Sequence, residues 1–162
     1  MDYRFGEMES AFAINTLATN LLNEGDTNSI KALAKENGID EDMTEFFISG
    51  EIDFLCDEMT AAIGKLDIEA KELGAKELMC DWIDYIKGLA SEDPDMAAVI
   101  KRKDKKLSEC IGELLKYSFS NQIEVSKEIL QAANIKANRV TFGVPSMRAA
   151  KEIIKNYYLG RR

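Results

Sequence analysis

Helical spacing of apolar residues, with few interruptions, is the feature that most constrains the fold of this chain. Only two prolines occur in 162 residues, and apolar side chains recur three and four positions apart over most of the length. That spacing places them on one face of a helix. Near the start, Ile14, Leu17, Ala18 and Leu21 form such a stripe, and Gly25 follows as a helix stop.

The same pattern, with capping residues before the stripes and glycine after them, predicts a succession of helices. The expected helices are 10–24, 29–37, 41–49, one carrying Ile52 to Ile63 and ending near Gly64, 67–90 with a kink at Gly74, 94–101, one carrying Leu107 to Leu115, 123–132, and 146–160. Residues 139–144 have β-type side chains and are expected to be extended, but the sequence indicates no second strand to pair with them. We therefore expect an all-α chain, with residues 1–162 forming a single compact domain of about seven or eight helices.

Charge divides the chain into an acidic part and a basic part. Residues 1–99 carry 23 acids against seven bases, a net of −16, and residues 100–162 carry six acids against 14 bases, a net of +8. The segment 36–64 contains nine acids and neither Lys nor Arg. Such a surface repels nucleic acid and attracts a basic surface, including the channel of a nucleic-acid enzyme.

The acids of this base-free segment are the candidate partner-binding residues. They are Glu36, Asp40, Glu41, Asp42, Glu45, Glu51, Asp53, Asp57 and Glu58. Like charges one helical turn apart, such as Glu41 and Glu45, cost a few tenths of a kcal/mol per pair and stabilise nothing locally. Two interpretations stand: a solvated acidic surface, or an array of carboxylates that imitates a phosphate backbone.

Basic residues give a second set of candidates. The candidate anion contacts are Lys101, Arg102, Lys103, Lys105, Lys106 and Arg148. No aromatic side chain is interleaved in the run 101–106, so stacking on single-stranded bases is not indicated. The favoured interpretation of the run is a solvated corner or an intramolecular partner of the acidic part. Arg148 lies just after Gly143-Val-Pro-Ser146, a helix start that offers N–H groups to an anion.

Residues 33–40 look like the first helix and tight turn of a helix-turn-helix motif, with Ala34 and then Gly38 at the usual spacing. The following helix departs from that motif. It has Thr44 where a buried aliphatic residue is usual, and it would present Glu41 and Asp42 to the DNA groove, where phosphate repels them. A plain helical corner is the favoured interpretation, an acidic protein-binding face is the alternative, and direct nucleic-acid binding is not expected.

The residues that most catalytic and metal sites require are missing. Histidine is absent, which removes Ser-His and Cys-His catalysis and the usual zinc and di-iron sites. No phosphate-binding loop, dinucleotide fingerprint or EF-hand loop occurs. The cysteines, Cys56, Cys80 and Cys110, fall among helical apolar positions and predict buried, unreactive thiols. We expect no enzymatic activity, no cofactor and no metal.

No apolar run reaches the ~20 residues that span a bilayer, and the first residues lack the apolar core of a signal peptide. A cytoplasmic location without a membrane partner is therefore expected.

Residues 21–26 and 33–40, together with Phe142-Gly-Val-Pro-Ser146 and Tyr157-Tyr-Leu-Gly160, resemble segments of small acidic accessory proteins of conjugative elements and phages from gut Firmicutes. That group includes inhibitors of CRISPR nucleases, and anionic inhibitors of this class often occupy nucleic-acid channels. The resemblance implies a mobile-element protein that inhibits a nucleic-acid-handling host protein such as a CRISPR effector nuclease. The alternative is an accessory protein of the element that binds DNA or self-associates into a homo-oligomer through its oppositely charged parts.

Overall fold

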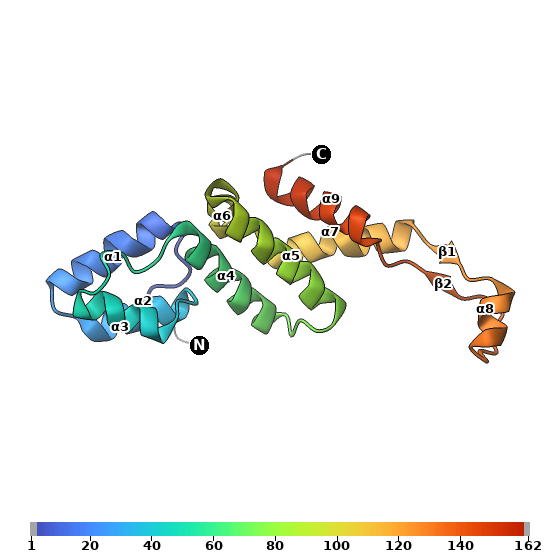
Figure 1. The fold of residues 1–162 in the computed structure, drawn as a ribbon, viewed down its shortest axis with the longest axis horizontal. Coiled ribbons are helices and arrows are strands. Elements are labelled where there is room, and N and C mark those ends of the chain that lie inside the picture. Colours follow the sequence, from blue (N-terminus) through green and yellow to red (C-terminus); the bar gives the residue numbers. More distant parts are fainter. Residues whose placement is uncertain (1–2, 161–162) are drawn as a thin grey trace. The chain divides into compact units, whose positions relative to one another are not determined.

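The computed structural model describes residues 3–160, which are helical over most of their length (Figure 1). The helices in that range are α1 Ala11–Asn23, α2 Thr27–Glu36, α3 Glu41–Ser49, α4 Glu58–Glu72, α5 Leu78–Glu92, α6 Pro94–Lys101, α7 Leu107–Ser120, α8 Lys127–Ala132 and α9 Met147–Leu159. Two short strands, β1 Ile123–Glu124 and β2 Thr141–Phe142, complete the elements. The expected mostly helical fold class is confirmed.

The contacts within the chain group into two units, residues 1–108 and residues 109–162, with the boundary in the first turn of α7. In the first unit, α1 packs against α2 and α2 against α3, while α4, α5 and α6 pack against one another. Fully buried aliphatic residues from successive elements, including Ile14, Ile30, Leu33, Leu55 and Leu66, form its interior. Trp82 on α5 is buried as well.

Short polar side chains fix where most helices begin. A Ser or Asp oxygen accepts a backbone N–H of the first turn at the start of α1, α2, α3, α4, α6, α8 and α9. Each such cap satisfies one of the N–H groups that a helix leaves without an internal partner. These caps explain why the predicted boundaries of α1, α3, α6 and α9 agree with the structure to within a residue or two.

Two of the predicted helices are wrong in the middle of the first unit. Residues 51–57 are irregular, and α4 starts at Glu58 and continues through Gly64 to Glu72. The expected helix 67–90 is therefore two helices, α4 and α5, joined by a turn in which Gly74 and Glu77 have positive φ angles of 60° and 51°. Gly64 therefore lies inside α4 and does not end a helix. Because it has no side chain, a neighbouring segment of backbone can approach α4 closely at this point.

That neighbour is the turn between α2 and α3. A Cβ placed on Gly64 would lie 2.4 Å from the carbonyl oxygen of Asn37, and a Cβ on Gly38 would lie 2.3 Å from the carbonyl oxygen of Gly64. Gly38 also has a φ of +69°, which favours glycine. The glycine that suggested a helix-turn-helix motif is thus required by its contact with α4.

The second unit contains α7 from Glu109 onward, the two strands, α8 and α9. Cys110 and Leu114 of α7 are buried, as are Leu130 of α8 and Ile154 of α9. The strands pair antiparallel. The extended segment expected at 139–144 therefore has a partner, which lies in the predicted helix 123–132; that helix is in fact β1 followed by α8. Strands of two residues are too short to give an alternating pattern in the sequence.

No helix within residues 3–160 has the length and apolar character that crossing a membrane requires.

Candidate functional site: an acidic groove on the first unit

Several acids of the base-free segment have local structural roles. Asp40 accepts a backbone N–H at 2.8 Å at the start of α3, and Asp57 accepts one at 2.7 Å at the start of α4. Glu41 and Asp42 lie in the first turn of α3, and Glu58 lies in the first turn of α4. The helix macrodipole favours negative charge at these places. Part of the acidic run therefore stabilises the helices that carry it.

Glu36 is committed to the N-terminal segment. Its carboxylate accepts the backbone N–H groups of Arg4, Phe5 and Gly6 at 2.7, 2.8 and 2.8 Å. Burial raises the pKa of Glu36, but the three N–H donors outweigh it, so the pKa lies below its ordinary value. This predicted partner-binding residue has an intramolecular partner.

Glu45 lies beside a base although the surrounding sequence has none. Lys31 of α2 places Nζ 2.6 Å from Glu45 Oε1, and the hydrogen bond from this carboxylate raises the pKa of Lys31. Both side chains are about half exposed, so the pair contributes little to stability. A segment free of bases in sequence is thus not entirely free of them in space.

The remaining acids are less constrained. Glu41, Asp42, Asp53 and Glu58 are exposed, and no ion pair to a Lys or Arg is formed by any of them within residues 3–160. Glu51 is exposed too and lies 3.2 Å from the hydroxyl of Ser49, with which it hydrogen-bonds. Asp53 neither caps a helix nor pairs with another side chain in this part of the chain. Glu51 and Asp53 are the acids that local structure explains least.

A groove of about 650 Å³ lies beside these two acids. Residues of α1, α3, the irregular segment 51–57 and the start of α4 line it. Its charged lining residues are all acids: Glu51, Asp53, Asp57 and Glu58. We call this feature the acidic groove. It brings together four of the nine predicted partner-binding residues.

Two phenylalanines line the acidic groove and face solvent. The exposed fractions are 79 % for Phe12 on α1 and 68 % for Phe54 in the segment 51–57. Met43 and Ile52 add half-buried apolar surface. A purely solvated acidic surface has no need of aromatic side chains, whereas apolar surface rimmed by charge is typical of a binding groove.

The wall of the acidic groove is held by one amide. Asn15 of α1 donates from Nδ2 to the carbonyl oxygen of Cys56 at 2.8 Å, and its Oδ1 accepts the N–H of Cys56 at 3.1 Å. The Cys56 side chain is buried, and burial raises the pKa of its thiol to about 12. These two hydrogen bonds fix the irregular segment to α1, so the groove is formed before any partner binds.

The basic run 101–106 contains both buried and exposed side chains. Lys101 is only 1 % exposed, and Nζ donates to Oδ1 of Asn37 at 3.1 Å. Burial lowers the pKa of Lys101 to about 8. Lys106 donates to Glu7 at 2.7 Å. These two predicted anion contacts therefore point toward partners in the first unit.

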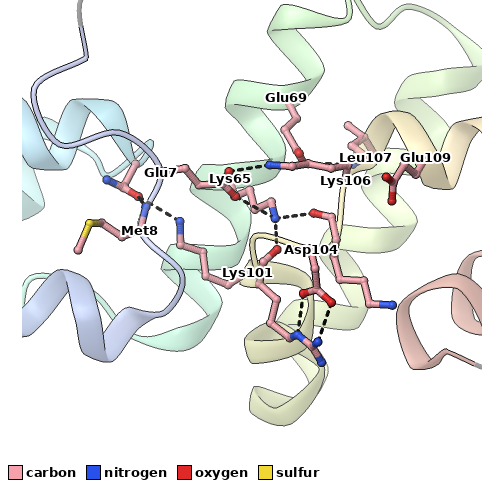
Figure 2. A network of polar contacts seen from close by, with 12 residues as sticks. Glu7, Met8, Lys65, Glu69, Lys101, Asp104, Lys106, Leu107 and Glu109 are labelled. Atoms are coloured by element: carbon pink, nitrogen blue, oxygen red, sulfur yellow. Dashed lines mark hydrogen bonds and ion pairs between the residues drawn. The ribbon is translucent and has the colours of Figure 1, made fainter.

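A third lysine completes that network. The buried Lys65 lies 3.1 Å from Oε1 of Glu7 and donates to the backbone carbonyl oxygens of Arg102 and Lys105 at 2.5 and 2.6 Å (Figure 2). Burial raises the pKa of Glu7, but the hydrogen bonds from Lys106 and Lys65 bring it below the ordinary value. A pocket of about 420 Å³ adjoins the network, and within its lining Glu7 is paired with both Lys65 and Lys106. The cluster supports the fold of the 102–105 loop.

The other predicted anion contacts remain at the surface or close to it. Arg102 forms a two-pronged pair with Asp104, at 2.8 and 2.6 Å. Lys103 is exposed and Lys105 is half-buried. Arg148 is exposed in the first turn of α9, in the second unit. Of the six basic candidates, five therefore belong to the first unit, where Lys101 and Lys106 have intramolecular partners, and Arg148 belongs to the second.

Within residues 3–160, no group of three or more Cys, Asp or Glu side chains is placed to hold a metal ion. The prediction of buried thiols holds for Cys56 and Cys110, but Cys80 on α5 is exposed. Burial raises the pKa of Cys110 to about 12. Cys80 differs because it lies off the stripe of Trp82, Ile83 and Ile86 that faces the interior.

The sequence pattern did not single out Phe12, Phe54 or Asn15. Two signals were available in the sequence for the phenylalanines. Phe12 lies off the helical stripe of Ile14 and its neighbours, and Phe54 lies off the stripe of Ile52 and Leu55 in the expected helix. The role of Asn15 depends on a contact 41 residues away, which no local pattern indicates.

The fold and site together define a mostly helical protein with a preformed acidic groove that carries exposed aromatic residues. Comparisons with protein-family models, with curated proteins and with solved structures found no match.

Proposed function

We propose that this chain is a non-enzymatic binding protein that inhibits a nucleic-acid-handling protein by placing its acidic surface on the partner's basic channel. The observation that carries the proposal is the lining of the acidic groove, in which every charged residue is an acid and two phenylalanines are exposed. Channels that bind phosphate are lined with Lys and Arg, so a rigid array of carboxylates competes with nucleic acid for them.

We assign partner binding to the exposed acids that neither cap a helix nor pair with a base in the described part of the chain, and not to the whole base-free segment. Asp40 and Asp57 cap helices, Glu36 binds backbone N–H groups and Glu45 pairs with a lysine. The acids free to meet a partner are Glu41, Asp42, Glu51, Asp53 and Glu58. The resemblance to accessory proteins of mobile elements directs the search for the partner to CRISPR effector nucleases.

The test is competition with nucleic acid. Purified CRISPR effector nucleases are assayed for binding and cleavage of labelled DNA with increasing amounts of this protein. A variant with Glu41, Glu51 and Glu58 changed to Gln, and Asp42 and Asp53 changed to Asn, should lose inhibition. The control variant carries Glu77→Gln, Asp81→Asn and Asp84→Asn, which change exposed acids outside the groove.

Inhibition that weakens as salt rises, and that the control variant retains, is the expected result. Equal inhibition by wild type and by this five-residue charge variant would show that the anionic surface is not the inhibitory element. No effect on any tested nuclease would remove the assignment of a CRISPR partner.

Self-association is a second candidate function, favoured by apolar surface on the second unit. Ile123 and Phe142 stand opposite each other on the two strands and are 70 % and 62 % exposed, and Phe119 of α7 is 77 % exposed. Size-exclusion chromatography over a range of salt concentrations separates the two modes of association. Contact between oppositely charged parts dissolves as salt rises, whereas an apolar contact persists.

A further inference from the structure

We infer that the acidic groove binds an amphipathic helix of the partner, with basic residues on its polar face and apolar residues that contact Phe12 and Phe54. This inference rests on the proposed function and names the element that the partner presents. The proposed function by itself requires only a basic surface.

The lining of the groove decides the chemistry of its occupant. The groove is lined by four acids and by no base: Glu51, Asp53, Asp57 and Glu58. An acidic or neutral segment would therefore gain no electrostatic attraction from these side chains. The exposed rings of Phe12 and Phe54 offer apolar area that a uniformly charged partner would leave in water. Only a segment that combines positive charge with apolar side chains uses both features.

The fold decides the conformation of the occupant. A peptide that binds as an added strand needs the free edge of a sheet, and the described part of the first unit, residues 3–108, contains no strand. A helix satisfies its own backbone N–H and C=O groups and can lie in a groove between side chains. The binding mode that we infer is a helix docked against α1 and the segment 51–57, with its apolar face on the two phenylalanines.

The groove is also prepared for docking. The two hydrogen bonds between Asn15 and Cys56 hold the segment 51–57 on α1, and Leu55 anchors it in the core with no exposed surface. Phe54 and Asp53 therefore project from a fixed backbone. Binding does not need to order this segment, which lowers its entropic cost.

The experiment uses synthetic peptides as probes. The first is an 18-residue helix-forming peptide with Leu at positions i, i+3, i+4 and i+7 and Lys on the other faces. The second has the same composition in scrambled order, and the third has Ser in place of Leu. Each is labelled, and its binding to the full chain is measured by fluorescence anisotropy at low and at moderate salt.

The amphipathic peptide should bind at least about tenfold more tightly than either of the others, because apolar anchors at the centre of an interface dominate its energy. Phe12→Ser and Phe54→Ser should each weaken its binding by about tenfold or more. The matched control is Phe119→Ser, which removes an equally exposed phenylalanine from the second unit and should leave binding unchanged. Asn15→Ala should weaken binding although it removes neither charge nor ring.

Equal affinity for the ordered and scrambled peptides, or equal binding by wild type and the two groove variants, would overturn the inference. The readout is independent of the nuclease assay. If Phe54→Ser still inhibits a nuclease while the charge variant does not, the proposed function stands and the helix-binding inference falls. If the peptide binds as expected but no tested CRISPR nuclease is inhibited, the groove assignment stands and the assignment of a CRISPR partner falls.

Discussion

Replacing Gly64 by alanine should destabilise the first unit, although the same change normally stabilises a helix. Gly64 lies in the interior of α4, where alanine is favoured over glycine by about 0.5–1 kcal/mol. The opposing effect is steric. The new Cβ would lie 2.4 Å from the carbonyl oxygen of Asn37 and 2.7 Å from that of Gly38, both of which are backbone atoms.

Backbone atoms cannot rotate out of the way, so α4 and the turn between α2 and α3 must separate. That separation would also disturb the buried amide of Asn37, whose Oδ1 accepts from Met8 N–H at 2.9 Å and from Lys101 Nζ at 3.1 Å. Inserting a carbon into a packed interior typically costs about 1–3 kcal/mol. Because the gain in helix propensity offsets part of this cost, we expect Gly64→Ala to lower the free energy of unfolding by up to about 2 kcal/mol.

The matched control is Gly88→Ala. Gly88 lies inside α5, also in the first unit, and a Cβ there would have no neighbour within 4 Å. This variant should be more stable than wild type by about 0.5–1 kcal/mol. The two Gly→Ala changes therefore have opposite expected signs.

Urea unfolding followed by the fluorescence of Trp82 measures both effects. Trp82 is the only tryptophan of the chain and is buried in α5, so its signal reports on the unit that contains both glycines. The midpoint should fall for Gly64→Ala and rise for Gly88→Ala at an unchanged slope. If Gly64→Ala raised the midpoint as the control does, the close approach of α4 to the α2–α3 turn would be refuted.

Three further predictions concern single side chains. Burial lowers the pKa of Lys101 from 10.5 to about 8. Between these two pH values the amine of Lys101 is therefore protonated in the unfolded chain and neutral in the folded protein. Wild type should therefore gain stability relative to Lys101→Met as pH rises from 8 to 10.5, by up to about 3 kcal/mol, and a difference independent of pH would contradict the burial of the charged amine. Glu36→Ala should speed hydrogen exchange at the amides of Arg4, Phe5 and Gly6 and lower the free energy of unfolding by about 1–3 kcal/mol. Peptide binding at the acidic groove should not change. Unchanged hydrogen exchange would mean that the Glu36 carboxylate does not fix this segment. A maleimide should label Cys80 in the folded protein and reach Cys56 and Cys110 only on unfolding, since the latter two are buried; labelling of all three at one rate would argue against the described packing.

Local sequence was sufficient for most of the helices. Caps such as Ser10 and Asp93-Pro94, and stops such as Gly50 and Gly160, act through hydrogen bonds and φ angles within a few residues. For that reason the fold class and several boundaries could be predicted before any contact was known. The prediction of helix boundaries failed where a residue contacts a segment far away in the sequence. Gly64 has the appearance of a helix stop in the sequence, but it is a point of backbone contact within α4.

The candidate site, too, has features that the sequence predicts and features that only the tertiary structure determines. Net charge and the base-free segment are properties of the sequence, and they alone determine that an acidic surface must exist. Which acids remain available was decided by tertiary structure, because Glu36 turns to the backbone of residues 4–6 and Glu45 meets Lys31 from another helix. The acidic groove depends on Asn15 reaching Cys56 across 41 residues of chain. Contacts over such separations depend on how helices pack, and packing is set by the whole set of buried side chains rather than by any local pattern.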